Sequence, residues 1–175
     1  MTTKPSPLSS QLIIRNMIRA DLPASVKIMR SEVFPSLSRR GFERMVKGSK
    51  IVCQVGSIDD VIVGVIVYLL AQTFIRILIL CVIEDWKRKG VGRRMLDVAE
   101  KRAEGVLTRT KVVACVPENL LPQGTRYLRH MGYSATGVEP GVCAGEVDLV
   151  IMEKPIKRSA TAGHPSQTSI KGAGS

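Results

Sequence analysis

The 175-residue chain is poor in aromatic residues and in histidine. Aromatic side chains make up 4% of the sequence, and the two histidines are His130 and His164. Proteins that hold single-stranded nucleic acid use aromatic side chains to stack on bases, so the composition argues against that class. The sequence also lacks the closely spaced cysteine pairs of a metal knuckle, and we expect no metal site.

Long hydrophobic runs are missing as well. The longest candidate, residues 61–83, is interrupted by Arg76 and falls short of the roughly 18 apolar residues that a membrane helix needs. The four cysteines lie 28, 34 and 28 residues apart, a spacing that favours small buried side chains in a reducing compartment over disulfides. We therefore expect a protein without membrane spans, located in the cytoplasm.

Acidic residues are too few to balance the basic ones, and the net charge is +11. Residues 1–20 and 154–175 together contribute seven basic and no acidic residues, which leaves 19 basic and 15 acidic residues in 21–153, a net charge of +4. Within that central part, five of the eight residues in 87–94 are basic. A focused patch beside glycines favours a phosphate-bearing ligand over a specific nucleic-acid partner.

Hydrophobic periodicity predicts one domain over residues 12–156. Residues 1–11 are polar and contain proline, and residues 157–175 are rich in Ser, Thr, Gly and Ala, so we expect both segments to be disordered. The predicted order within the domain is strand, helix, helix, three strands, helix, strand, helix and two strands. The predicted strands are 12–18, 51–55, 61–70, 74–83, 111–116, 133–138 and 147–152, and the predicted helices follow Asp21, span 38–46, follow Gly90 and span 122–131.

A basic, glycine-containing turn follows the long apolar strand 74–83. Glycines at 90 and 92 let backbone N–H groups approach a pyrophosphate without obstruction by a Cβ atom, and the first turn of a helix adds unpaired donors. Gly-x-Gly with basic neighbours is also typical of a solvated turn that merely caps a helix. Its position after a long apolar strand favours the phosphate site.

Residues 82–92, Val-Ile-Glu-Asp-Trp-Lys-Arg-Lys-Gly-Val-Gly, resemble the central motif of the GNAT superfamily of N-acetyltransferases. That motif runs from a bulged strand into a helix through Arg/Gln-x-x-Gly-x-Gly/Ala. The resemblance implies an α/β GNAT fold, with a mixed, mostly antiparallel sheet of about seven strands flanked by about four helices. Further segments resemble the family's opening strand (14–22), third strand (63–66) and Gly-aromatic pair (131–133), and others resemble the substrate loop (32–35) and closing strand (148–152) of ribosomal-protein and protein N-terminal acetyltransferases.

The resemblance further implies an enzyme that uses acetyl-CoA as co-substrate and acetylates an amine, with a protein N-terminus as the best guess for the acceptor. At the position of the family's usual Arg or Gln, Lys87 keeps the charge but lacks a planar fork. Backbone groups near Val82 are expected to pair with pantetheine. The cofactor residues implied are Val82, Lys87, Arg88, Lys89, Gly90, Val91, Gly92 and Arg93.

The catalytic residues depart from the family pattern. The tyrosine found four residues before the Gly-aromatic pair in N-terminal acetyltransferases is replaced by Leu128, and Tyr127 lies one place earlier. Tyr127 is the candidate proton donor to the departing thiolate, but a helical step of about 100° would ordinarily turn it into the core and leave Leu128 facing the site. Both interpretations stay open from the sequence.

The family's acidic base on the fifth strand falls at Ala114. An N-terminal α-amine, with a pKa near ~8, needs a base less than a lysine near ~10.4 does, which favours a low-pKa acceptor. The alternative to an active enzyme is a catalytically impaired acyl-CoA-binding module.

Overall fold

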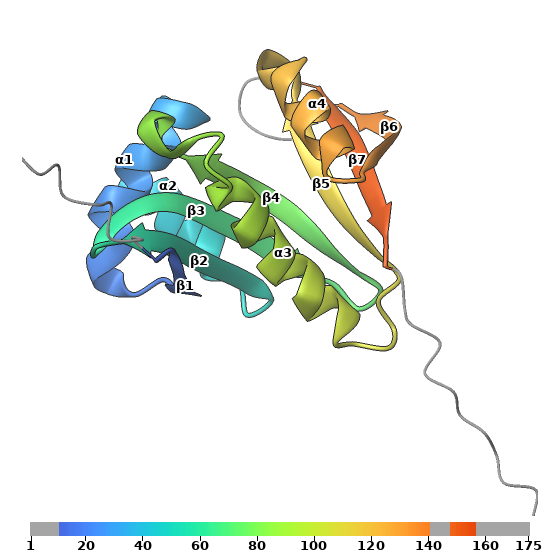
Figure 1. Ribbon diagram of the computed structural model, residues 1–175, viewed down its shortest axis with the longest axis horizontal. Coiled ribbons are helices and arrows are strands. Elements are labelled where there is room, and N and C mark those ends of the chain that lie inside the picture. The colour runs from blue at the N-terminus through green and yellow to red at the C-terminus, as the bar shows by residue number, and fades with distance from the viewer. Residues whose placement is uncertain (1–10, 141–147, 157–175) are drawn as a thin grey trace, which may run out of the picture.

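The computed structural model describes residues 11–140 and 148–156. Most of the two segments expected to be disordered, together with Cys143, lie outside these residues. The strands and α-helices within them follow in the predicted order (Figure 1). The strands are β1 (Ile13–Asn16), β2 (Ile51–Ile58), β3 (Val61–Leu70), β4 (Phe74–Val82), β5 (Lys111–Pro117), β6 (Ser134–Glu139) and β7 (Leu149–Pro155), and the helices are α1 (Leu22–Glu32), α2 (Arg39–Val46), α3 (Val91–Glu104) and α4 (Gln123–His130).

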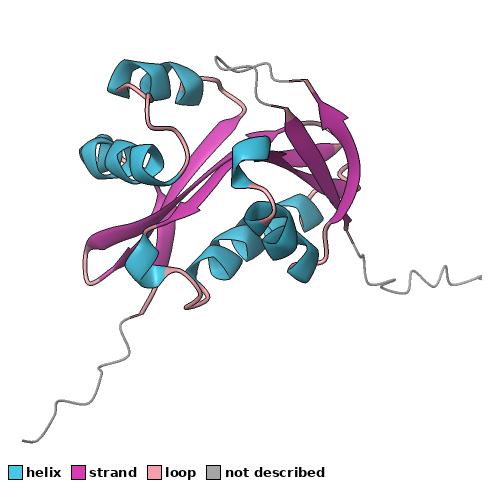
Figure 2. Cartoon of the chain, turned by 90° about the horizontal axis from the view of Figure 1, so that it is seen from above, coloured by secondary structure: helices cyan, strands magenta, loops and turns pink. Residues whose placement is uncertain are grey.

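The strands form one seven-stranded sheet in the order β1-β2-β3-β4-β5-β7-β6. Neighbouring strands are antiparallel except β4 and β5, which run parallel. Figure 2 shows helices on both faces of the sheet. Helices α1 and α2 cover one face over β2 to β4, and α3 and α4 cover the other. This arrangement confirms the expected fold class.

A β-bulge in β4 turns the strand over between the two hydrophobic cores. In the pairing of β3 with β4, Tyr68 faces Ile77 and Val67 faces Ile79, so Leu78 is passed over. Ile77 therefore packs in the core under α3, whereas Ile79 packs in the core under α1 and α2. A slip of one residue exchanges the faces of a strand. The strand consequently buries side chains on both faces, which explains its continuous apolar sequence.

Strands β4 and β5 pair over only part of their lengths. Their ladder begins at Phe74 and Lys111 and ends at Ile77 and Ala114, although β4 runs on to Val82 and β5 to Pro117. Figure 1 shows the two strands together at their beginnings and apart at their ends. In the separated stretch, the backbone groups of β4 that point toward β5 are not used in this ladder.

Three side chains join the strands around the last residues of the β4–β5 ladder. The guanidinium of Arg76 on β4 forms an ion pair with Glu139 on β6, and its Nε atom lies 3.2 Å from Cys115 Sγ on β5. Arg76 thus connects β4 to the strands on the far side of the ladder's end. These contacts fix where the opening starts.

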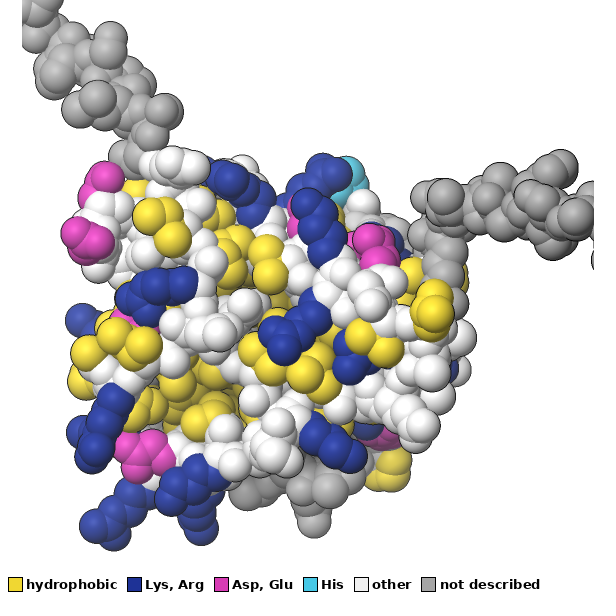
Figure 3. Space-filling model, turned by 90° about the horizontal axis from the view of Figure 1, so that it is seen from below, with side chains coloured by type: hydrophobic (Ala, Val, Ile, Leu, Met, Phe, Trp, Pro, Cys, Tyr) yellow, Lys and Arg dark blue, Asp and Glu magenta, His cyan; other side chains and the backbone are white. Residues whose placement is uncertain are grey.

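Two surface properties follow from the described residues. Lysine and arginine side chains lie between acidic and hydrophobic ones on the lower face of the molecule (Figure 3). Among residues 11–140 and 148–156, the helices are too short or too polar to cross a membrane.

Candidate active site

The turn before α3 has a backbone conformation that glycine supplies. A short 3-10 helix, Glu84–Trp86, follows β4, and two residues of the turn have positive φ: Arg88 at 59° and Gly90 at 84°. The left-handed region disfavours residues with a side chain, which explains the glycine at position 90. A Cβ atom built on Gly90 would meet no atom within 4 Å. The requirement at Gly90 is therefore conformational, and the space beside it is open.

Helix α3 begins directly after this turn. The first amides of a helix have no intrahelical acceptor and carry the positive end of its dipole, so they bind anions. Val91 is buried in the core, which holds the first turn in place. The start of α3 therefore has the backbone geometry that suits an anion, with Arg88 and Arg93 on either side of it in the chain.

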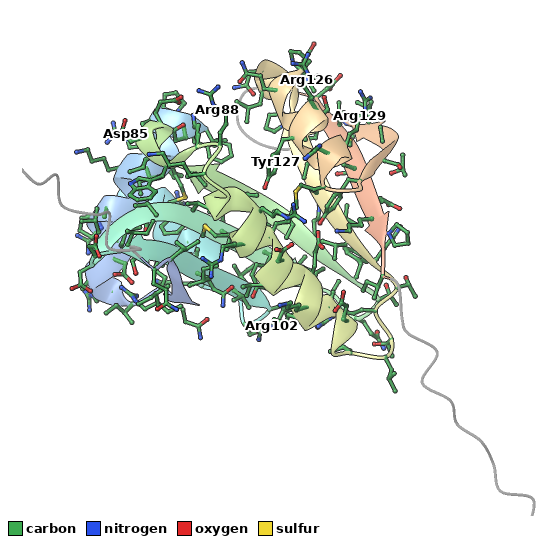
Figure 4. All side chains as sticks on the ribbon, in the orientation of Figure 1. Asp85, Arg88, Arg102, Arg126, Tyr127 and Arg129 are labelled. Carbon is green, nitrogen blue, oxygen red and sulfur yellow. The ribbon has the colours of Figure 1, made fainter. Side chains whose placement is uncertain are left out.

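Three elements of the fold meet at Gly92. A Cβ atom on Gly92 would lie 3.1 Å from the hydroxyl oxygen of Tyr127 on α4 and 3.7 Å from Cγ2 of Val82 at the end of β4. Figure 4 shows Arg88 and Tyr127 on opposite sides of the opening between the two halves of the sheet. The end of β4, the first turn of α3 and the Tyr127 hydroxyl therefore surround one point.

Tyr127 and Leu128 occupy the reverse of the positions that helical geometry favoured. Leu128 is 6% exposed and packs in the core, whereas Tyr127 is 37% exposed. The buried face of α4 contains Thr125 and Leu128, three residues apart, and Tyr127 lies beside that face and points toward α3. The interpretation of Tyr127 as a core residue is wrong, as is the expectation that Leu128 faces the site.

The surroundings of Tyr127 keep its hydroxyl protonated. Burial is the main cause that raises the pKa of Tyr127 to about 12, and the charges of Asp97 and Glu100 on α3 act in the same direction. Arg93 opposes them. Tyr127 is therefore a hydrogen-bond donor throughout the neutral and mildly alkaline range.

The basic side chains of the turn have different partners. Lys87 Nζ lies 2.6 Å from Glu32 Oε2 and 2.7 Å from Glu84 Oε2. Lys89 Nζ lies 4.8 Å from the centre of the Trp86 ring, a cation–π contact. The Lys87 ion pair with Glu32 was missed from the sequence, because the two residues are far apart in the chain and no spacing rule connects them.

The position of the family's base carries no acid in this fold. Ala114 is 3% exposed and pairs with Ile77 at the end of the β4–β5 ladder. Its methyl group belongs to the core under α3. Ala114 therefore offers no group that could accept a proton.

These features define a class of protein: a single α/β domain whose split sheet, anion-binding helix start and phenol donor suit group transfer from a phosphate-bearing donor. The acetyltransferase (GNAT) family model matches residues 20–133. The chain belongs to this family and is an N-acetyltransferase. A comparison with curated proteins finds no significant match.

Several solved structures share this fold, and the similarity extends over nearly the whole length of each of them. Ard1 from Thermoplasma volcanium is similar with a TM-score of 0.72 and 18% identity over 84% of this chain and 99% of that one. For the ribosomal-protein-S18-alanine N-acetyltransferase from Escherichia coli, the TM-score is 0.67 and the identity is 18%, over 86% of this chain and 97% of that one. For Arabidopsis thaliana NAA60 in complex with a bisubstrate analogue, the TM-score is 0.69 and the identity is 19%, over 85% of this chain and 100% of that one.

The positions of the two α4 residues predict that substitutions at Leu128 and Tyr127 change stability by very different amounts. Leu128→Ala should lower the free energy of unfolding by about 2–5 kcal/mol, because it leaves a cavity in the core. Tyr127→Phe should change it by less than about 0.5 kcal/mol, because its hydroxyl faces the opening. Urea unfolding monitored by circular dichroism measures both. A larger loss in Tyr127→Phe than in Leu128→Ala would contradict the placement.

Proposed function

We propose that this chain transfers the acetyl group of acetyl-CoA to an amine, and that the acceptor is the α-amine of a protein N-terminus. The observation that carries the proposal is the meeting of Val82, the first turn of α3 and the Tyr127 hydroxyl around Gly92. An anion site, open strand backbone and a proton-bearing hydroxyl are the groups that a diphosphate thioester needs. Membership of the acetyltransferase family supports the reaction type.

The diphosphate of the co-substrate fits the start of α3. The amides of the first turn have no intrahelical acceptor and could bind the diphosphate, and the absence of a side chain at position 90 leaves open space beside them. Arg88 and Arg93 supply positive charge beside it. The residues that we assign to the co-substrate are Val82, Lys87, Arg88, Lys89, Gly90, Val91, Gly92 and Arg93.

The arm of the co-substrate suits the opening between β4 and β5. The β4 backbone between residues 78 and 82 has amide and carbonyl groups on the side from which β5 has departed. Pantetheine contains two amides that can pair with such groups as an added strand would. In this arrangement the thioester would lie near the end of β4, and the backbone donors there would polarise its carbonyl.

Tyr127 is the catalytic residue of the proposal. When the acceptor nitrogen attacks the carbonyl carbon, the bond to sulfur breaks and negative charge collects on the sulfur. The Tyr127 hydroxyl would donate a hydrogen bond to that sulfur and pass it a proton, and the proton that the acceptor nitrogen loses would restore the hydroxyl. Its raised pKa keeps the proton available.

The acceptor is inferred from two considerations. The amine must be neutral to attack, and an α-amine near ~8 meets this requirement without the base that Ala114 cannot provide. Ard1, NAA60 and the S18-alanine acetyltransferase are structural neighbours, which motivates testing peptide N-termini first. Other neighbours are aminoglycoside 6'-N-acetyltransferases, so small amines are the control panel. We place the activity in the cytoplasm, where thiols such as Cys53 and Cys81 stay reduced.

Gly90 tests the co-substrate site. Gly90→Glu should abolish acetyl-CoA binding in calorimetry, because its carboxylate would occupy and repel the diphosphate site. Gly90→Ala is the matched control, since it shares the backbone strain of a positive φ but adds a methyl group into open space. It should weaken binding far less. Wild-type affinity in a folded Gly90→Glu variant would refute the assignment.

Tyr127 tests the chemistry. Tyr127→Phe should reduce turnover by about 10²-fold or more while acetyl-CoA affinity stays close to wild type, as expected for the loss of a general acid. Because the pKa of Tyr127 is about 12, wild-type turnover should not fall between pH 8 and pH 10. The control is Tyr133→Phe. The Tyr133 hydroxyl donates to Glu100 at 2.9 Å, so its loss should affect stability more than turnover.

Coenzyme A release with a peptide library and a small-amine panel measures these rates. Tight acetyl-CoA binding without turnover on either panel would favour the acyl-CoA-binding module, for which the buried Ala114 is the specific observation. Turnover on small amines alone would refute the N-terminal acceptor.

A further inference from the structure

Lys87 connects the turn before α3 to helix α1. Its ammonium lies 2.6 Å from the carboxylate of Glu32, the last residue of α1, and 2.7 Å from that of Glu84. The Glu32 side chain is 15% exposed, whereas that of Glu84 is 76% exposed. The hydrogen bond from Lys87 to Glu32 is the main cause that raises the lysine's pKa. The pair with Glu32 is thus the dominant contact of Lys87.

Helix α1 packs against β4, and its last residue, Glu32, pairs with Lys87 shortly after the end of that strand. Burial raises the pKa of the Cys81 thiol to about 12, with the Glu32 charge as the next cause. Cys81 immediately precedes Val82, and its side chain packs in the core under α1 and α2. Glu32 therefore approaches the end of β4 from the α1 side, whereas Gly92 and Tyr127 approach it from the α3 side.

A carboxylate as sheltered as that of Glu32 needs a cation. Removing a charge from water is costly unless an opposite charge and hydrogen bonds replace the solvent. Lys87 fills this need in the structure. Its ammonium is carried on a flexible four-carbon stem, which allows the group to change partners without moving the backbone.

In the proposed function, the diphosphate is a second anion at the turn that contains Lys87, three residues before Gly90. If the diphosphate binds at the start of α3, it competes with Glu32 and Glu84 for the same ammonium. A single ammonium has three donors, but with its Nζ atom 2.6 Å from Glu32 it is directed toward α1, so close contact with a diphosphate at the start of α3 would require it to leave that carboxylate.

We propose that Lys87 is exchanged between Glu32 and the diphosphate, and that Glu32, once released, accepts a hydrogen bond from the amine of the acceptor. This inference rests on the proposed function. Co-substrate binding then prepares the acceptor site, because it removes the cation that occupies it. The exchange couples the two sites, and by linkage the acceptor amine must also strengthen co-substrate binding.

The proposal makes an unusual prediction about Glu32→Gln. Loss of this carboxylate should strengthen coenzyme A binding about three- to tenfold, because Lys87 no longer has to leave a buried partner. Lys87→Ala should weaken binding, and adding Glu32→Gln to Lys87→Ala should have no further effect. Calorimetric titration of the four proteins with coenzyme A forms a double-mutant cycle that needs no catalysis.

Control variants separate exchange from general charge effects. Glu43→Gln removes a carboxylate of α2 that pairs with Arg39 at 3.0 Å, and it should leave coenzyme A affinity unchanged. Glu84→Gln should strengthen binding less than Glu32→Gln, because Glu84 is exposed. It should not alter the KM of a peptide acceptor, whereas Glu32→Gln should raise that KM at least about fivefold with a smaller change in kcat.

The outcomes distinguish this inference from the proposed function. If wild type does not bind coenzyme A, the proposed function fails. If wild type binds but Glu32→Gln has the same effect with and without Lys87, or weakens binding in both, the exchange is refuted while the function stands. Should Glu32→Gln not fold, the cycle of Glu84→Gln with Lys87→Ala tests the exchange, and additive effects there would overturn it.

Discussion

The site depends on the incomplete pairing of β4 with β5. Four residues of each strand pair, and the strands then separate although both continue. Backbone hydrogen-bonding groups that leave a ladder inside a domain need other partners. The sheet is interrupted here, between two well-paired halves, and such groups lie at the edge of the opening, where we propose that the co-substrate binds.

The two halves of the sheet are held in this open geometry by different contacts. Arg76 fixes the start of the opening through Glu139 and Cys115. Farther along, α3 packs across β3, β4 and β5, so its first turn is held at the opening. The bulge at Leu78 directs Ile79 and Cys81 to the core under α1 and α2, whereas Val82 packs in the core under α3. In the proposed arrangement, the co-substrate and the acceptor would reach the end of this strand from opposite faces.

The order of elements and the glycine turn could be predicted from the sequence, because both follow from local rules. Hydrophobic periodicity distinguishes strands from helices, and a positive φ at Gly90 explains the residue found there. The orientation of Tyr127 could not be derived, because it depends on which face of α4 packs against the core. In the structure Leu128 is on that face, and Tyr127 is partly exposed beside it. The partner of Lys87 was hidden for a similar reason: only the packing of α1 against the end of β4 brings Glu32 to it.

The most direct test of the account is a titration of the isotopically labelled protein with coenzyme A, followed by amide chemical shifts in NMR spectra. The account predicts that the largest changes fall on the amides of Gly90, Val91 and Gly92, with a second group in residues 78–82 of β4. Changes confined to other parts of the chain, such as α2 or the lower face, would contradict the claim that the opening between β4 and β5 is the co-substrate site.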